Sequence, residues 1–259
     1  MSEPPFLSIV VPAYNEARRL PRTLDSLRDF GREFTRAHEV LFVVERSSDG
    51  TLEIASEAAR QQENFLAIDS GPQRGKGHAV RAGMLRARGD YVFYMDADLS
   101  VPLAEIPAFL AHFDAHPEVG VIVGNRQHAR SRIVLRQSPL REKMGQSFNR
   151  LLQSFGLASL HDTQCGFKAF RHAAVQAIFS RQKLDGFAFD VEVLLLAERL
   201  GFHVADLPVE WRNSADSRVR LVRDSFAMFR DVLRVRRLVR KSGTGPIERL
   251  SLEEPFPPE

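Results

Sequence analysis

The sequence predicts an α/β fold in which a mostly parallel central sheet is flanked by helices. Short apolar runs rich in β-branched and aromatic residues alternate with segments of helical period through the first half of the chain. Such alternation is typical of parallel sheets that helices cover on both faces. The composition is that of an ordinary globular protein, with 259 residues of which 44% are hydrophobic and 27% charged, and this length suits one large α/β unit.

Strands and helices are predicted to alternate through the first half of the chain. The strands are expected at Leu7–Val11, Val40–Glu45, Phe65–Asp69, Tyr91–Met95 and Val119–Val123. The helices between them are expected at Leu20–Phe34, Leu52–Gln62, His78–Ala87 and Ile106–His116. The second half is richer in helical patterns, near 139–156, 171–181 and 190–200, followed by an extended segment Val204–Trp211 and a helix at 219–241. We expect one domain over residues 1–241 and a disordered acidic tail over 242–259, where Gly, Pro and Glu are frequent.

Composition also excludes several classes of protein. With a single cysteine, Cys165, the chain can form no intrachain disulfide, and a reducing compartment is expected. Neither a secretory signal nor a membrane-spanning apolar stretch is visible, which favours a cytoplasmic protein, soluble or peripheral at the inner face of a membrane. The net charge is +3, but the basic residues concentrate in 218–241, so we expect no general binding of nucleic acid.

Ligands of parallel α/β sheets bind at the carboxyl ends of the strands, and the most informative strand end is that of Tyr91–Met95. This buried apolar run leads directly into Asp96, Ala97 and Asp98. Two carboxylates two residues apart can share one hard cation, and Mg²⁺ or Mn²⁺ prefers such oxygen ligands. A divalent ion held there could bridge a diphosphate. Two solvated loop aspartates, or a general acid/base pair, are the alternatives.

Three further segments carry candidate binding groups. Pro12–Glu16 follows the first strand and suits a small planar ligand, although an ordinary turn would explain it too. Glu45 ends the second strand and could accept a hydrogen bond from a base or a ribose hydroxyl. Lys76 lies between Gly75 and Gly77 at a helix start, where the backbone could approach a phosphate, or where the glycines merely form a flexible turn.

Arginines at later positions could bind phosphate. Arg126 follows the fifth strand, Arg136 and Arg141 lie in a segment that leads into a helix, and Arg212 and Arg218 flank a polar loop. The guanidinium fork matches phosphate oxygens. Each of these arginines could equally be an ordinary surface charge.

Two later stretches are the most specific part of the pattern. DTQCGFKAF at 162–170 is dense in polar groups for a segment between helices, and FAFDVEVLLLAERL at 187–200 places two carboxylates at a helix start. Together with PAYNE, GKG and DAD, they resemble the family 2 glycosyltransferases of the GT-A (Rossmann-like) fold. Within that family they are most similar to the dolichyl-phosphate (polyprenyl-phosphate) sugar synthases, above all the dolichyl-phosphate β-glucosyltransferases. The resemblance covers residues 7–238.

This resemblance implies an inverting, metal-dependent transferase. Its donor would be a nucleotide-sugar, UDP-glucose before any other, its acceptor a polyprenyl or dolichyl phosphate, and its cofactor Mg²⁺ or Mn²⁺. The alternatives are a family 2 transferase that uses a soluble or glycan hydroxyl as acceptor, or GDP-mannose as donor. A hydroxyl acceptor would need a catalytic carboxylate, for which Asp162 and Asp190 are the candidates.

The resemblance also assigns roles to individual residues. Those implied to bind the nucleotide-sugar are Pro12, Tyr14, Glu16, Val43, Glu45, Lys76, Asp96, Ala97, Asp98, Arg212 and Arg218. Those implied to bind the acceptor are Arg126, Arg136, Arg141, Asp162 and Gln164. Asp96 and Asp98 would bind the metal, and Asp98, Arg126 and Arg141 would act in catalysis. The chain departs from the family pattern at Val44-Glu45, where paired aspartates are usual, at Ser100, where the mannose synthases have Gln, and at Arg218, where Lys is common.

The predicted helix 219–241 has a basic face that bears on the location of the protein. Arg223, Arg230, Arg234, Arg237 and Lys241 recur at helical spacing, and apolar residues occupy much of the opposite face. A basic amphipathic helix can lie on an anionic membrane surface, so peripheral membrane contact through this helix is a hypothesis. A helix packed on the core with a solvated cationic face is the alternative.

Overall fold

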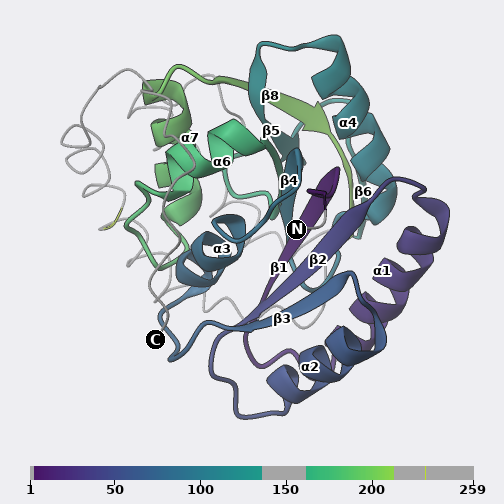
Figure 1. Ribbon diagram of the computed structural model, residues 1–259. Helices are drawn as coiled ribbons and strands as arrows, with labels where there is room; N and C mark the ends of the chain where they lie inside the picture. The colour runs from purple at the N-terminus through teal and green to yellow at the C-terminus, as the bar shows by residue number, and fades with distance from the viewer. Residues whose placement is uncertain (1–2, 136–161, 213–230, 232–259) are drawn as a thin grey trace.

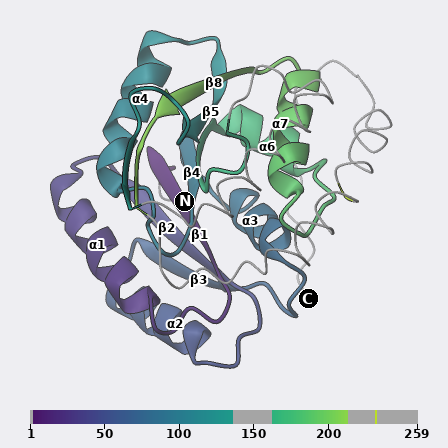
Figure 2. The ribbon, with the colours of Figure 1, turned by 180° about the vertical axis from the view of Figure 1, so that it is seen from behind.

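The protein forms one seven-stranded sheet with helices on both faces, seen from opposite sides in Figure 1 and Figure 2. The computed structural model describes residues 3–135, 162–212 and 231. The strand order is β3-β2-β1-β4-β7-β5-β8. Their bounds are β1 Leu7–Ala13, β2 His38–Val44, β3 Phe65–Asp69, β4 Tyr91–Met95, β5 Val119–Asn125, β7 Phe167–Arg171 and β8 His203–Pro208. All neighbouring pairs are parallel except those of β7, so the predicted α/β fold with a mostly parallel sheet is confirmed.

Two groups of helices cover the sheet. On one face lie α1 (Leu20–Glu33), α2 (Thr51–Gln61) and α4 (Ile106–Ala115), and on the other lie α3 (Lys76–Met84), α6 (His172–Phe179) and α7 (Phe189–Arg199) (Figures 1 and 2). The short helix η1 (Leu103–Glu105) contacts α1 and α4. Apolar spacing explains the orientation of each helix. In α4, for example, Ile106, Phe109, Leu110 and Phe113 are buried, the spacing of one face of an amphipathic helix.

The main departure from prediction is β7. The stretch 162–168 was expected to lie between helices, but its last residues begin a strand that runs antiparallel between β4 and β5, with Tyr94 opposite Lys168. A second departure is a two-stranded parallel sheet of β6 (Arg132–Leu135) and β9 (Glu210–Arg212), so that the predicted extended segment Val204–Trp211 divides into β8 and β9. Of the two strands that were missed, β6 has only four residues, and β7 contains a lysine, which argues against a buried strand.

Several predictions lie outside the described residues. These are the helix near 139–156, the basic helix 219–241 and the acidic tail 242–259. The predicted strands Phe65–Asp69 and Tyr91–Met95 match β3 and β4 in both bounds. The other predicted strands and helices of the first half occur within a few residues of their expected ends.

The core is built on both faces of the central strands. Phe93 on β4 contacts the rings of Phe109 and Phe167 on one face, whereas Tyr94 packs against Phe170 and Phe189 on the other. All six rings are buried. Consecutive residues of β4 therefore anchor opposite helix layers, which holds the end of β4, and whatever follows it, in a fixed place.

A charged side chain is buried in the middle of this core. Lys168 on β7 is fully buried, and its Nζ donates to Asp190 Oδ1 at 2.6 Å, Cys165 O at 2.7 Å and the Tyr94 hydroxyl at 2.8 Å. The Tyr94 hydroxyl in turn donates to Asp190. Burial, and then the charge of Asp190, raises the pKa of Tyr94 well above its usual value, so Tyr94 keeps its proton. A buried ammonium needs this complete set of partners.

Replacing Lys168 with Met should therefore strongly destabilise the fold. The substitution leaves the Asp190 carboxylate buried without its ammonium, and breaking one side of a buried pair costs about 3–5 kcal/mol of unfolding free energy. Urea denaturation followed by circular dichroism measures the loss. The double variant Lys168→Met with Asp190→Asn should recover more than half of it, and a single variant as stable as the wild type would contradict this account.

Candidate active site

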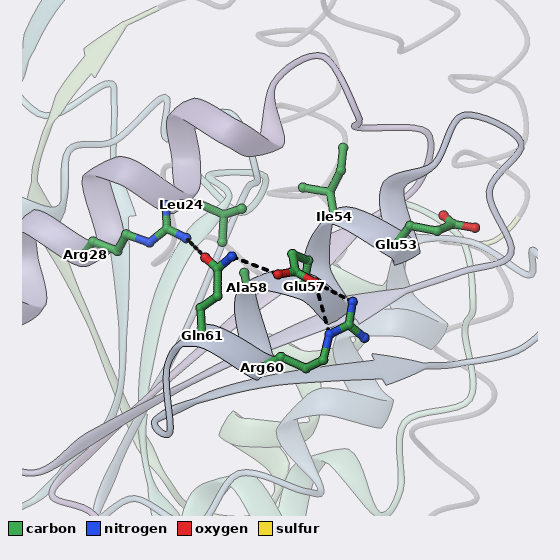
Figure 3. A pocket seen from close by; sticks show the side chains of 8 residues that line it. All are labelled: Leu24, Arg28, Glu53, Ile54, Glu57, Ala58, Arg60 and Gln61. Carbon is green, nitrogen blue, oxygen red and sulfur yellow. Dashed lines mark hydrogen bonds and ion pairs between the residues drawn. The ribbon is translucent and has the colours of Figure 1, made fainter.

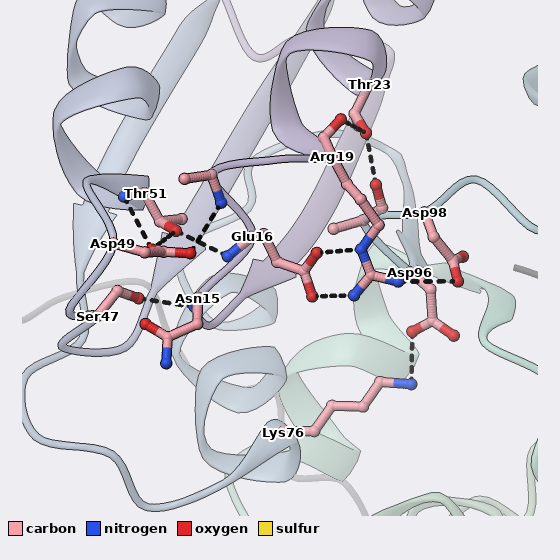
Figure 4. A network of polar contacts seen from close by, with 12 residues as sticks. Asn15, Glu16, Arg19, Thr23, Ser47, Asp49, Thr51, Lys76, Asp96 and Asp98 are labelled. Carbon is pink, nitrogen blue, oxygen red and sulfur yellow. Dashed lines mark hydrogen bonds and ion pairs between the residues drawn. The ribbon is translucent and has the colours of Figure 1, made fainter. Parts of the chain in front are cut away.

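The loops after β1 and β2 are braced against each other at the carboxyl edge of the sheet. Asn15 N donates to Ser47 Oγ at 3.0 Å, and Glu16 N donates to Thr51 Oγ1 at 2.7 Å. Asp49 binds the Thr51 hydroxyl and completes the contact (Figure 4). These bonds use backbone amides that would otherwise need solvent, and they give the edge a rigid wall beside the end of β4.

Asp96 and Asp98 lie in this edge, each beside a cation. Asp96 Oδ1 is 2.6 Å from Lys76 Nζ, and Asp98 Oδ2 is 3.7 Å from Arg19 Nη1 (Figure 4). The other oxygen of Asp98 accepts two hydrogen bonds, from Ser100 N at 3.0 Å and from Ser100 Oγ at 2.7 Å. Ser100 thus orients Asp98. The structure brings the predicted pair and Lys76 together.

The acidic pair has the chemistry of a site for a hard divalent cation. Both groups offer carboxylate oxygens, and their side chains keep 38% and 18% of their surface open to solvent. Within the described residues, no cluster of three or more His, Cys, Asp or Glu could hold a metal. Two protein carboxylates, with waters and substrate phosphates completing the shell, is the usual arrangement for Mg²⁺. The residues present fit Mg²⁺ or Mn²⁺ on this ground.

Strained backbone marks the same edge. Among the described residues, Asn15 and Leu99 are the non-glycine positions with positive φ, at 53° and 47°. Asn tolerates this left-handed region, but for Leu it is costly. Asn15 follows β1 and Leu99 follows Asp98, so both lie in loops at the carboxyl edge of the sheet. Strain of this kind persists only where the surroundings impose it, and it clusters at functional sites.

Gly166 supports Asp96 from below. Asp96 N donates to Gly166 O at 3.1 Å, and a Cβ placed on Gly166 would overlap the Asp96 carboxylate. The adjoining Cys165 carbonyl is the one that Lys168 holds. Burial raises the pKa of the Cys165 thiol to about 12, so this buried thiol stays protonated and is no nucleophile. The turn 165–166 is a platform for Asp96, and glycine is required at position 166 because a side chain there would overlap the Asp96 carboxylate.

Lys76 is a permanent cation at the start of α3. Burial disfavours its charged form, but the charges of Asp96 and then Asp190 outweigh burial, and the pKa of Lys76 is raised. Its Nζ also lies 5.7 Å from the centre of the Tyr94 ring. Lys76 therefore joins the acidic pair to the buried Lys168 cluster.

Glu45 has a local role that was not foreseen. It is buried at the end of β2, and its Oε1 accepts hydrogen bonds from Arg74 N at 2.9 Å and Gly75 N at 2.8 Å. This carboxylate therefore fixes the loop that carries Lys76. The predicted contact of Glu45 with a base or ribose stays a prediction, as do those of Pro12 and Val43, which pair with each other across β1 and β2.

Of the remaining predicted nucleotide contacts, Ala97 and Arg212 lie next to the acidic pair or its loop. Tyr14 is half-buried in the loop after β1, and Ala97 is buried and accepts a hydrogen bond from Thr23 Oγ1 through its carbonyl. Arg212 on β9 is exposed and pairs with Glu210, while its N donates to Ser100 O at 2.8 Å. This last bond places β9 beside the loop of the acidic pair.

Arg126 and Asp162 form a second polar centre, at the end of β5. Asp162 accepts from Arg126 N at 2.9 Å, Nε at 2.7 Å and Nη2 at 2.7 Å. Arg126 keeps 27% of its side-chain surface exposed, and Asp162 keeps 1%. Burial opposes ionisation of Asp162, but the Arg126 charge and hydrogen bonds prevail, and the pKa of Asp162 is lowered. The same pairing raises the pKa of Arg126.

Other predicted acceptor residues are only partly placed. Gln164 lies in the turn after Asp162, and its buried Nε2 has no hydrogen-bond partner among the described residues, nor does the buried Oγ1 of Thr163. Arg136, Arg141 and Arg218 lie outside the described residues.

One residue of the edge, Arg19, was not predicted. It forms a two-pronged pair with Glu16, with Nε at 2.6 Å and Nη2 at 2.5 Å from the carboxylate oxygens. An arginine just before a helix usually lies at the surface. Apart from its place four residues after Asn15, the sequence therefore contained no indication that Arg19 belongs to the site.

A shallow groove elsewhere on the molecule lies between α1 and α2 (Figure 3). Leu24, Ile54 and Ala58 form its apolar part, and Arg28, Gln61, Glu57 and Arg60 are joined across it by hydrogen bonds (Figure 3). All its lining residues belong to helices, and none of the strand-end groups above contributes to it.

Comparison with known proteins gives consistent matches. The family model described as "Glycosyl transferase family 2" matches residues 8–179. The dolichyl-phosphate β-glucosyltransferase of Saccharomyces cerevisiae is 32% identical over 250 residues, which cover 89% of this chain and 74% of that protein. The protein of the same name from Dictyostelium discoideum is 31% identical over 241 residues, with the same shares.

Solved structures resemble the chain in fold. Glucosyl-3-phosphoglycerate synthase from Mycobacterium tuberculosis, crystallised with Mn²⁺, UDP-glucose and phosphoglyceric acid, superposes with a TM-score of 0.68 at 16% identity, covering 89% of this chain and 79% of that one. Mannosyl-3-phosphoglycerate synthase from Rubrobacter xylanophilus superposes with a TM-score of 0.66 at 20% identity, covering 90% and 74%. In the described part of this chain, no helix has both the length and the apolar character needed to cross a bilayer.

The platform under Asp96 can be tested with two glycine variants. Gly166→Ala forces a methyl group into the Asp96 carboxylate and should weaken Mn²⁺ binding by about tenfold or more, as changes to the supporting shell of a metal ligand do. Gly186→Ala is the control, because the nearest atom to its new methyl is Asp231 Oδ2 at an ordinary 3.9 Å. Titration of free Mn²⁺ by electron paramagnetic resonance measures both. Equal Mn²⁺ affinities would rule out the platform.

The Arg126–Asp162 pair predicts a pH-dependent stability. Because the folded-state pKa of Asp162 lies below its ordinary value, its ionised form stabilises the protein at neutral pH, and this contribution declines as pH falls below about 4. Asp162→Asn should lose about 3 kcal/mol of unfolding free energy at pH 7, and the gap to the wild type should narrow at pH 3. Urea titrations at several pH values measure it.

The matched control for this comparison is Asp29→Asn. Asp29 also pairs with an arginine, Arg32, at 2.7 Å, but both side chains are exposed. Exposed pairs contribute little, so this variant should follow the wild type at every pH. If Asp162→Asn behaves like the control, the buried pair contributes nothing of the expected kind.

Proposed function

The chain belongs to glycosyl transferase family 2 and is a hexosyltransferase of the GT-A fold, and from this premise we propose that it transfers glucose from UDP-glucose to a polyprenyl or dolichyl phosphate with the help of Mg²⁺ or Mn²⁺. The observation that carries the proposal is the acidic pair Asp96 and Asp98 at the end of β4, with Lys76 and Arg19 beside it. The names of the relatives support glucose as the sugar and dolichyl phosphate as the acceptor.

The donor diphosphate is proposed to lie along the carboxyl edge between β1 and β4. Asp96 and Asp98 would hold the divalent ion, whose chemistry is to neutralise the negative charge that develops on the departing nucleoside diphosphate. Lys76 contributes a fixed positive charge beside Asp96, and Arg212 approaches through β9. These charges are in place before the reaction, so little reorganisation is needed as the leaving group forms.

The chemical step is a direct displacement at the anomeric carbon. An oxygen of the acceptor phosphate forms the new bond to that carbon, while its bond to the diphosphate oxygen breaks and the nucleoside diphosphate leaves with the electron pair. The configuration is inverted. A phosphate monoester is already anionic near neutral pH, so no protein base has to remove a proton, and catalysis rests on positioning and charge stabilisation.

Arg126 is proposed to face the acceptor phosphate. Asp162 holds its guanidinium through Nε and Nη2 and leaves the rest of the fork partly exposed. Its raised pKa keeps it charged, and a planar, preorganised cation suits a phosphate. Arg136 and Arg141, outside the described residues, complete the proposed acceptor site, and Arg218 the donor site.

A hydroxyl acceptor is the second candidate, but the site supports it less well than a phosphate acceptor. Such an acceptor needs a general base, yet both candidate carboxylates are committed. Asp162 accepts three hydrogen bonds from Arg126, and Asp190 is bound to Lys168 and Tyr94. Either would have to leave a buried ion pair to take a proton. We therefore propose a phosphate acceptor. Peripheral attachment to the membrane through residues 219–241 is a separate part of the proposal.

The donor assignment is tested by calorimetric titration of UDP-glucose, UDP-galactose and GDP-mannose with Mn²⁺ or EDTA. UDP-glucose should bind only with the metal, and Asp98→Ala should weaken its binding by about tenfold or more. Asp29→Ala, exposed on α1, is the control and should bind normally. Tighter binding of GDP-mannose would reassign the donor, and no binding of any nucleotide-sugar would overturn the proposal.

The acceptor is tested by activity with radiolabelled UDP-glucose. Dolichyl phosphate in detergent should become labelled, whereas free dolichol and soluble glycans should not. Arg126→Lys keeps the charge but loses the fork, and it should raise the KM for dolichyl phosphate more than the KM for UDP-glucose. Labelling of a glycan hydroxyl instead would favour the second candidate.

A further inference from the structure

We propose that Arg19 is a donor-binding residue that serves as the counter-ion of Asp98 until the metal ion binds, and then as a ligand of the donor diphosphate. The inference rests on the proposed function, because it concerns the same site. It follows from the position of the guanidinium, between a carboxylate assigned to the nucleotide and a carboxylate assigned to the metal (Figure 4).

The geometry of Arg19 is imposed by its surroundings. Glu16 grips the guanidinium at Nε and Nη2, at 2.6 and 2.5 Å, and both side chains are mostly buried. Glu16 is itself fixed, since its N donates to Thr51 Oγ1 and its carbonyl accepts from Arg19 N at 2.9 Å. A two-pronged pair of this kind fixes the plane of the guanidinium. The face toward Asp98 is therefore presented in a defined direction.

A second contact fixes the distance between Arg19 and the acidic pair. Thr23, one turn further along, donates through Oγ1 to the carbonyl of Ala97, the residue between Asp96 and Asp98. The first turn of α1 is thus attached directly to the loop that carries the pair. Because Arg19 lies at the start of that turn, its position 3.7 Å from Asp98 Oδ2 is a property of the backbone arrangement as well as of the side chain.

The contact of Arg19 with Asp98 differs in length from its contact with Glu16. At 3.7 Å the Arg19–Asp98 contact is an ion pair without a close hydrogen bond, whereas the contacts to Glu16 are at hydrogen-bond length. Arg19 therefore neutralises Asp98 without occupying it. Ser100 holds the other oxygen of Asp98, so Oδ2 can bind a metal ion while Glu16 keeps the guanidinium in place beside it.

The charges of the network explain why two cations are present. Among the described side chains of the network, Glu16, Asp96 and Asp98 carry three negative charges, and Arg19 and Lys76 carry two positive ones, so these five have a net charge of −1. A diphosphate is repelled from such a site, but after a divalent ion binds, the net charge is +1 and the diphosphate is attracted. The arrangement predicts that the metal binds before, or together with, the donor.

Removal of the Arg19 charge should have opposite effects on the two ligands. Arg19→Gln takes away a cation near Asp98, so Mn²⁺ alone should bind about threefold more tightly. With Mn²⁺ saturating, UDP should bind about tenfold more weakly, because a charge-assisted contact to the diphosphate is lost. Arg19→Lys should keep most of the Mn²⁺ affinity of the wild type and recover part of the UDP affinity. Electron paramagnetic resonance measures Mn²⁺, and calorimetry measures UDP.

Arg32→Gln is the matched control. Arg32 lies in α1, the helix that follows Arg19, and also pairs with an acidic residue three positions earlier, Asp29 at 2.7 Å, but this pair is exposed. The control should bind both ligands as the wild type does. Thermal unfolding of each variant without ligands reports on any loss of folding.

Each outcome of the Arg19 experiment has one meaning. Opposite shifts in Mn²⁺ and UDP affinity support the proposal. Weaker binding of both ligands, together with a lower melting temperature, would show that the Arg19–Glu16 pair only holds the turn, and unchanged UDP affinity would also overturn the proposal. If wild-type protein binds Mn²⁺ but no UDP, the proposed function fails, whereas the counter-ion role of Arg19 is still decided by the Mn²⁺ titration alone.

Discussion

A positive charge enclosed in the centre of the sheet is the constraint on which the site depends. Lys168 has no solvent, so its ammonium must find its partners in α7, in β4 and in the turn before β7. The observed placement of β7 satisfies all three. That placement brings Gly166 under Asp96, so the position of a carboxylate at the surface is determined by an ion pair beneath it. Buried ion pairs that demand complete satisfaction can specify one arrangement among many.

The charges at the carboxyl edge differ from the buried Lys168 pair, because each is paired with an opposite charge but remains exposed to solvent. Asp96 and Asp98 each have a cation within 4 Å and still face solvent, which favours an incoming divalent ion without burying an unpaired charge. Leu99 is held in a costly backbone conformation beside them, and the Ser100–Asp98 hydrogen bonds keep the turn closed. Preorganisation of this kind lowers the local stability of the loop. The densely packed core beneath it compensates for this loss.

How far the sequence predicted this structure depends on the range of the interactions involved. β3 and β4 were predicted with their bounds because apolar runs ended by turn residues are a local signal. β7 was missed because a lysine at its second position argues against a buried strand until Asp190 is known to lie beside it. The hydrogen bonds from Glu45 to the amides of Arg74 and Gly75, and the place of Arg19, depend on packing between distant segments. The resemblance to a family supplied Arg126 and Lys76, which composition and period alone left open.

The antiparallel strand has a consequence for how the chain is made. A nascent chain emerges from the ribosome with its amino end first, so β1 to β4 can pair with one another as soon as they have emerged. β5, however, joins the sheet only through β7, which follows it by more than forty residues. Until then the edge of β4 exposes unpaired amides and carbonyls, an open template for another strand. Chains that stop short of residue 171 should therefore associate with one another, and this enzyme should depend on chaperones most in that interval of its synthesis.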